Sequence, residues 1–207
     1  MAPTTAYPYV DAITTFGRGL GAARSGEATA ARQEATKLQT IRERLLEAKD
    51  TYWAEQTEIL RRAVAAWAGR DDQAAALQLM RSAADMEDVS IKHIAMEDRL
   101  VPMRELLGEL LVEAGQPGAA LREFEQSLQN APNRFRSFYG AAQAAERAGD
   151  TAKARGVLRE AGHALPAGGH GARGIEGSTL ARPYAPDSIT HGAPVRRRRP
   201  RIDKGRP

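Results

Sequence analysis

Three glutamates, Glu105, Glu109 and Glu113, recur at intervals of four residues within a leucine-rich stretch of the chain. Residues at this spacing lie one helical turn apart on the same face, so the three carboxylates would form an acidic stripe. Such a stripe is complementary to a basic segment of a partner, and it favours binding over catalysis. A solvated helix face that binds nothing is the alternative interpretation of the same pattern.

The sequence holds no pattern typical of a catalytic or metal-binding site. It has no Cys, which excludes disulfides, thiolate metal ligands and a cysteine nucleophile. The histidines are isolated from one another: His93, His163, His170 and His191. A group of carboxylates lacks the spacing and the glycine of a calcium-binding loop: Asp85, Glu87, Asp88, Glu97 and Asp98. We therefore expect no metal, no cofactor and no enzymatic activity.

A second kind of chemistry is indicated near the end of the chain, where arginines cluster: Arg196, Arg197, Arg198, Arg199 and Arg201. Residues 167–207 carry a net charge of +6, whereas residues 1–166 carry −2. Guanidinium groups that neutralise phosphates release counterions, so this segment would bind nucleic acid or another polyanion without sequence specificity. Folding back of the segment onto the acidic stripe is a further hypothesis.

Hydrophobic periodicity predicts helices along almost the whole of residues 1–164. The helix-favouring residues Ala, Leu, Glu, Arg and Gln are abundant and β-branched residues are sparse, so the expected fold class is all-α. The predicted helices span residues 9–25, 28–49, 51–68, 72–85, 103–114, 118–130, 134–148 and 151–164. The stretch 86–102 fits either a continued helix or an ordered loop that ends at a proline.

Four glycines lie between predicted helices, and an alanine follows each of them by five residues. The glycines are Gly26, Gly69, Gly115 and Gly149, and the alanines are Ala31, Ala74, Ala120 and Ala154. A glycine at a helix end adopts the left-handed conformation that lets the chain reverse, and the small alanine lets the next helix come close. The pattern predicts four antiparallel helix pairs that bury their apolar faces by stacking.

The last two pairs repeat at a spacing of 34 residues. The matching residues of the first pair are Gly108, Gly115, Ala120, Phe124 and Pro132. Those of the second pair, in the same order, are Ala142, Gly149, Ala154, Leu158 and Pro166. The segment "LLGELLVEAGQPGAALREFEQSLQNAP" resembles the tetratricopeptide repeat, with Leu-Gly in the first helix, Gly at the turn, Ala and an aromatic residue in the second helix, and Pro at the exit. The earlier pairs have longer spacings and are tetratricopeptide-like. Segments such as "YPYVDAITTFGRGLGAARSG" are similar to the C-terminal part of larger bacterial tetratricopeptide-repeat proteins of poorly defined function.

The resemblance implies a short solenoid whose first helices line a concave surface, where members of the family hold peptides. It implies eight candidate binding residues: Glu105, Glu109, Val112, Glu113, Tyr139, Gln143, Glu146 and Arg147. The carboxylate clamp of some members uses Lys and Asn at such places. Because acidic residues stand there in this chain, a basic protein or peptide segment is the expected partner. The implied function is a non-enzymatic protein-protein interaction module, or scaffold.

The resemblance and the composition together predict two regions. Residues 1–166 are expected to form the tetratricopeptide-like domain, with strict repeats over 101–134 and 135–166. Residues 167–207, rich in Gly, Pro and Arg, can bury too little apolar surface to fold and are expected to be disordered. The first residues lack the basic start and apolar core of a signal peptide, and no stretch reaches the ~18 apolar residues of a membrane span. A cytoplasmic location without membrane contact is therefore expected.

The expected core consists of large side chains at helix-packing positions: Trp53, Trp67, Leu107, Leu111, Phe124, Leu128, Phe138 and Leu158. The glycine-rich segment "GRGLGAARSG", residues 17–26, has some likeness to a phosphate-binding loop. It lacks the Gly-Lys-Ser/Thr ending and the preceding strand that such a loop requires. Close packing of small residues within a helix is the preferred interpretation.

Overall fold

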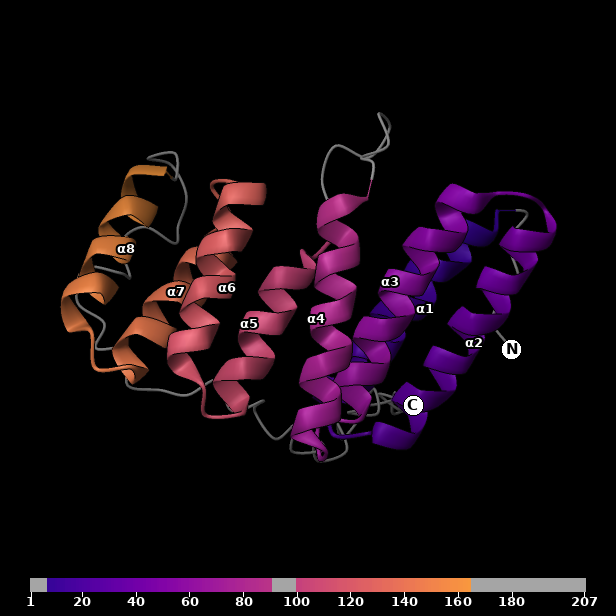
Figure 1. Cartoon of the computed structure of the whole chain (residues 1–207), viewed down its shortest axis with the longest axis horizontal. Coiled ribbons are helices and arrows are strands. Elements are labelled where there is room, and N and C mark those ends of the chain that lie inside the picture. The colour runs from indigo at the N-terminus through magenta and orange to yellow at the C-terminus, as the bar shows by residue number, and fades with distance from the viewer. Residues whose placement is uncertain (1–6, 91–99, 165–207) are drawn as a thin grey trace, which may run out of the picture.

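The computed structural model describes residues 7–90 and 100–164, and every regular element within them is an α-helix (Figure 1). In chain order the helices are α1 (Pro8–Arg24), α2 (Ala28–Glu47), α3 (Thr51–Ala68), α4 (Gln73–Val89), α5 (Met103–Glu113), α6 (Pro117–Asn130), α7 (Phe135–Arg147) and α8 (Thr151–Ala164). None of them combines the length and the apolarity needed to cross a membrane. The all-α fold class is confirmed for this part of the chain, and the segment 167–207 lies outside it.

The predicted helix bounds agree with the observed ones to within two residues at every end but one. Helix α4 continues to Val89 instead of ending at residue 85, so the beginning of the ambiguous stretch is helical. Residues 91–99 of that stretch lie outside the described residues. Helix α4 also contributes to the start of α5, because the Glu87 carboxylate accepts a hydrogen bond from the backbone N–H of Met103 at 2.7 Å. That N–H has no partner within its own helix, and Glu87 satisfies it.

Consecutive helices pack against each other in chain order, and the short links between most of them make neighbours antiparallel (Figure 1). The main contacts that skip one helix join α1 to α3, α3 to α5 and α5 to α7. The odd-numbered helices therefore lie side by side along the array. The side of the array that α1, α3, α5 and α7 form is called the odd-helix face below.

Four helix ends share one backbone hydrogen-bond pattern. After α1, α2, α5 and α7, the two residues that follow the C-cap donate back into the last turn, and the first of the two has a positive φ. The left-handed residues at these ends are Gly26, Lys49, Gly115 and Gly149. The left-handed conformation predicted for Gly69 is not observed, because the φ of this residue is −102°. Residues 70–72 lengthen the link after Gly69, so a tight left-handed reversal is not needed there.

A buried alanine lies four residues after the N-cap in five of the helices. These residues are Ala31, Ala54, Ala76, Ala120 and Ala154. Three of them match the prediction, whereas Ala74 is exposed and Ala76 takes its place. The reason is that three residues separate Gly69 from α4, whereas one residue separates Gly26, Gly115 and Gly149 from the helix that follows each of them. The burial of an alanine near the start of the second helix of each pair is confirmed, and its predicted register in α4 is wrong.

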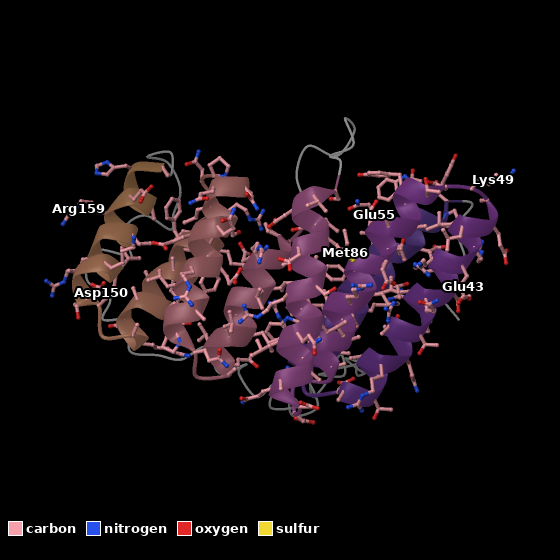
Figure 2. The ribbon with its side chains drawn as sticks, viewed as in Figure 1. Glu43, Lys49, Glu55, Met86, Asp150 and Arg159 are labelled. Atoms are coloured by element: carbon pink, nitrogen blue, oxygen red, sulfur yellow. The ribbon has the colours of Figure 1, made fainter. Side chains whose placement is uncertain are left out.

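Replacing Lys49 with glycine is expected to raise the free energy of unfolding by about 0.5–1 kcal/mol, because glycine adopts a positive φ without the clash of a Cβ. Lys49 is exposed at the turn between α2 and α3 (Figure 2), so the substitution removes little contact. The reciprocal control is Gly115→Lys after α5, where an added Cβ meets no atom within 4 Å. This control should lower the free energy of unfolding by a similar amount, which urea unfolding followed by circular dichroism measures. A lower free energy of unfolding for the Lys49→Gly variant would contradict the positive φ of Lys49.

Phe124 of α6 is central to the packing of the second half of the array. It is 1% exposed, and a Cβ added at Gly108 of α5 or at Gly140 of α7 would come within 2.8 and 2.4 Å of its ring. The burial of Phe124 agrees with the register that the repeat predicts. Four more of the expected core side chains are buried, namely Trp67, Leu107, Leu111 and Phe138. The other three, Trp53, Leu128 and Leu158, are only partly buried and pack against the edge of the core.

The glycine-rich segment 17–26 lies in α1 and its C-terminal turn. Gly19 is buried, and a Cβ at this position would come 2.7 Å from Val64 of α3. Gly17 and Gly21 have no such neighbour within 4 Å. Close packing of a small residue inside a helix, the preferred interpretation of this segment, is therefore confirmed at Gly19.

Candidate functional site

Glu105, the first residue of the predicted acidic stripe, is fully buried, with 0% of its surface exposed. Its Oε2 accepts a hydrogen bond from the Ser137 hydroxyl at 2.7 Å and another from the Arg134 Nε at 3.3 Å. Its Oε1 lies 3.3 Å from the Nε of Arg136. The expectation that Glu105 lines an open binding surface is wrong, because α7 packs against α5 and brings these three polar groups with it.

The other two glutamates of the stripe also have cationic partners within the protein. Glu109 is largely buried and pairs with Arg24 of α1 and with Arg136, whose Nη2 lies 2.6 Å from Glu109 Oε1. Glu113 is half-exposed, and its Oε2 lies 3.8 Å from the Nε of Arg70. Arginines from distant parts of the chain therefore offset the charge of the stripe, so it is not an open acidic surface.

The remaining candidates differ in accessibility. Val112, Tyr139 and Gln143 are partly buried, and Glu146 and Arg147 are exposed. Tyr139 stacks on Phe135 with ring centroids 6.4 Å apart, and Phe135 is 45% exposed. Phe135 is not among the predicted binding residues, although an aromatic residue one turn before Tyr139 is a signal for such a pair. A role of these residues in binding stays a prediction.

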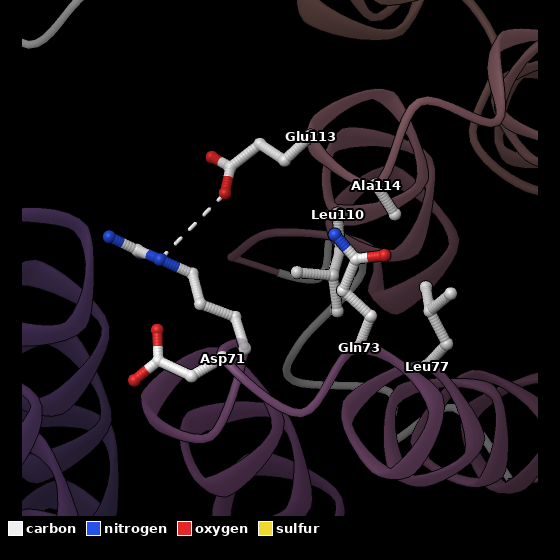
Figure 3. Close-up of a pocket in the computed structure, with 7 residues that line it drawn as sticks. Asp71, Gln73, Leu77, Leu110, Glu113 and Ala114 are labelled. Atoms are coloured by element: carbon white, nitrogen blue, oxygen red, sulfur yellow. Dashed lines mark ion pairs between the residues drawn. The ribbon is translucent and has the colours of Figure 1, made fainter.

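A cavity of about 290 Å³ opens where the link between α3 and α4 meets the end of α5 (Figure 3). Its apolar lining is Leu77, Leu110 and Ala114, and its polar lining is Arg70, Asp71, Gln73 and Glu113. In Figure 3, Asp71 and Glu113 lie to one side of the group, and Leu77, Leu110 and Ala114 lie to the other. The cavity therefore has its carboxylates on one side and its apolar residues, together with the amide of Gln73, on the other. Glu113 is the one predicted binding residue in its lining.

Arg70 is held beside the cavity by contacts with the first helices. Its Nη1 donates a hydrogen bond to the backbone carbonyl of Ala23 at 2.8 Å. Its guanidinium carbon lies 6.0 Å from the ring centroid of Trp67, and that of Arg24 lies 4.9 Å from the same centroid. These contacts restrict the side chain of Arg70, so this residue would lose less conformational freedom when a ligand binds.

The carboxylates at the end of α4 have structural partners. Arg104 of α5 pairs with Asp85 at 2.6 Å and with Asp88 at 2.8 Å. It also pairs with Glu123 of α6 at 3.0 Å, so one arginine joins three helices. Within residues 7–90 and 100–164, no group of three or more His, Cys, Asp or Glu side chains could hold a metal ion. The other two carboxylates of the sequence pattern, Glu97 and Asp98, lie outside these ranges.

The arginine-rich segment is also outside the part of the chain that the structure describes: Arg196, Arg197, Arg198, Arg199 and Arg201. Its association with nucleic acid or with the acidic stripe stays a prediction. Deletion of residues 190–207 separates these possibilities, because loss of nucleic acid binding would support the first and a gain in binding of basic peptides would support the second. Among the histidines, His163 is described and is exposed near the end of α8.

Comparison with known proteins finds no matching family model, no similar curated protein and no similar solved structure. The tetratricopeptide resemblance therefore rests on the sequence pattern alone and stays a prediction.

Proposed function

We propose that residues 1–166 form a short tetratricopeptide-like solenoid that acts as a non-enzymatic interaction module for a protein or peptide partner. The contacts among odd-numbered helices along one side of the array and the recurring helix ends support this proposal. In a solenoid, each repeat contacts its neighbours and the stacked helices form an extended binding surface. The odd-helix face is the corresponding surface of this protein.

The cavity beside Glu113 is the observation that carries the proposal. Its volume of about 290 Å³ suits one large apolar side chain of a partner. It lies just below the roughly 300–1,000 Å³ typical of small-molecule pockets. Interface energy concentrates on a few anchor side chains that enter such pockets and exclude water. An apolar anchor would contact Leu77, Leu110 and Ala114.

The charged side of the cavity favours a basic residue next to this anchor. Asp71 and Glu113 place two carboxylates there, and Arg70 is paired with Glu113 at 3.8 Å. The three groups together carry a negative charge, so a Lys or Arg of the partner gains more from this position than an acidic residue does. The basic partner expected from the sequence is retained, but its proposed contact moves from the acidic stripe to the cavity.

Ala114→Met is expected to weaken peptide binding by at least about tenfold, because the longer side chain fills the cavity that the anchor would occupy. The probe is a set of peptides selected by phage display of random peptides on the full chain, and calorimetry measures their affinity for each variant. We expect the selected peptides to share an apolar residue adjacent to Lys or Arg.

The matched control is Ala148→Met, because Ala148 is exposed and occupies the same C-cap position in α7, 34 residues later. It should bind the selected peptides as tightly as the unchanged chain does. Selection of no peptide, or equal affinity for the Ala114→Met and Ala148→Met variants, would contradict the proposed function.

A further inference from the structure

Three arginines converge on one buried carboxylate at the side of α3 that faces α2 and α4. Glu58 is 8% exposed, and Arg61 donates to it from Nε and Nη2 at 2.8 and 2.7 Å. Arg62 donates from Nε at 2.7 Å, and the Nε of Arg42 of α2 lies 3.6 Å away. Helix α3 lies between α2 and α4 in Figure 1, in agreement with its contacts to both. The group of Glu58, Arg42, Arg61 and Arg62 is called the arginine cluster below.

The charges of the arginine cluster do not balance. Among the described residues, Glu58 is the one acidic partner of all three arginines, so the cluster has a net charge of +2. Burial alone raises the pKa of Glu58, but the hydrogen bonds from Arg61 and Arg62 outweigh it and lower the pKa to about 2. Glu58 is therefore already ionised at neutral pH, and the two surplus positive charges have no counterpart in the described part of the chain.

The cluster is partly sheltered from water. The side chains of Arg42, Arg61 and Arg62 are 33, 27 and 30% exposed. Charges at such positions are screened less by salt than charges on an open surface. A second anion at this place would therefore be attracted more strongly than at an isolated surface arginine.

Hydrogen-bond donors remain at the outer edges of the guanidinium groups. Arg61 uses Nε and Nη2 on Glu58, and Arg62 uses Nε on Glu58 and Nη1 on the hydroxyl oxygen of Ser82 in α4. Nη1 of Arg61, Nη2 of Arg62 and both Nη atoms of Arg42 make no hydrogen bond within the described residues. Because Ser82 accepts from Arg62, its own O–H is a further donor.

We propose that Arg42, Arg61, Arg62 and Ser82 form a binding site for an oxyanion of the phosphate class, either a free phosphate ion or a phosphomonoester group. The planar fork of an arginine matches two oxygens of a phosphate, and Arg42 keeps both of its Nη atoms for such a contact. Arg61 and Arg62 each keep one further Nη donor. A dianion also balances the two surplus charges. None of these residues lines the cavity of the proposed function, so the two sites can be tested separately.

The test is a calorimetric titration of the full chain with sodium phosphate at about pH 8, with chloride keeping the ionic strength constant. We expect saturable binding of one phosphate per chain. Arg42→Gln should weaken this binding by about tenfold because it removes one charged fork. Arg42 makes the longest contact with Glu58, so its loss disturbs the fold least. Ser82→Ala keeps every charge and should weaken binding by about threefold through the loss of one donor.

Arg44→Gln is the matched control, because it changes the same charge on an exposed side chain of the same helix. It should leave phosphate affinity unchanged, and thermal melting verifies that each variant is folded. Phosphoserine in a parallel titration separates the two sources: tighter binding than phosphate assigns a phosphomonoester, and equal or weaker binding assigns the free ion. Equal phosphate affinity of the unchanged chain, Arg42→Gln and Ser82→Ala, or the absence of saturable binding, overturns the proposal.

Discussion

Phe124→Ala is expected to lower the free energy of unfolding by about 3–5 kcal/mol. The ring is 1% exposed and fills a slot between Gly108 of α5 and Gly140 of α7. Glycine has no side chain that can move into the space a lost ring leaves, so the cavity would stay largely open. One substitution therefore weakens the packing of α5, α6 and α7 together. Urea unfolding followed by far-UV circular dichroism measures the effect.

The fit of Phe124 in this slot can also be tested by a substitution at one of the glycines that line it. Gly140→Ala should destabilise by about 1–3 kcal/mol, because the added methyl group overlaps the Phe124 ring. The control is Gly156→Ala in α8, where an added Cβ meets no atom within 4 Å. That variant should gain about 0.5–1 kcal/mol, the ordinary preference of a helix for alanine over glycine. Equal responses at the two glycines would show that the Phe124 ring does not occupy the slot.

The burial of Phe124 is predictable from the sequence because the information is local. The repeat spacing places it one turn after a small residue, Ala120, on the apolar side of a helix that is predicted almost completely. Turn glycines and helix periodicity likewise act over a few residues. These features determine the number of helices, most of their bounds and the central core positions.

Two departures show where local patterns are insufficient. Lys49 takes the left-handed position after α2 that glycine takes elsewhere, and its residue type gives no sign of it. Ala76 replaces the predicted Ala74 because the length of the preceding link sets the register of α4. The cavity beside Glu113 depends on that same link, since Arg70 and Asp71 belong to it. A cavity formed where two separate segments meet has no signature in either segment.

The candidate binding surface is the least predictable part, because exposure depends on what packs above a residue. Spacing alone places Glu105, Glu109 and Glu113 on one helix face, and that inference holds for α5 as an isolated helix. In the structure, α7 covers Glu105, and Arg24 reaches Glu109 from a position 85 residues earlier in the chain. Only Glu113 keeps half of its side chain exposed, and it is the glutamate that lines the cavity.

The double variant Arg134→Gln/Arg136→Gln is expected to destabilise the protein by about 3–5 kcal/mol, because it leaves the carboxylate of Glu105 buried without a cationic partner. Both arginines lie 3.3 Å from Glu105, and the Ser137 hydroxyl would be its remaining hydrogen-bond donor among these groups. The two arginine side chains are themselves partly exposed, at 27 and 47%. Removing Glu105 should therefore cost less than removing the arginines, because they can regain contact with water.

Because Glu105 is buried and the two arginines are partly exposed, we expect a substitution of Glu105 to restore stability to the arginine double variant. Glu105→Gln alone should cost about 1–2 kcal/mol through weakened hydrogen bonds. Added to the arginine double variant, it should restore most of the lost stability, because it removes the buried charge that had become unpaired. The control is Arg147→Gln/Arg155→Gln, which changes the net charge equally at two exposed positions and should stay within about 0.5 kcal/mol of the unchanged chain. If the triple variant is no more stable than the double variant, Glu105 does not depend on these arginines, and the packing of α7 over α5 has another basis.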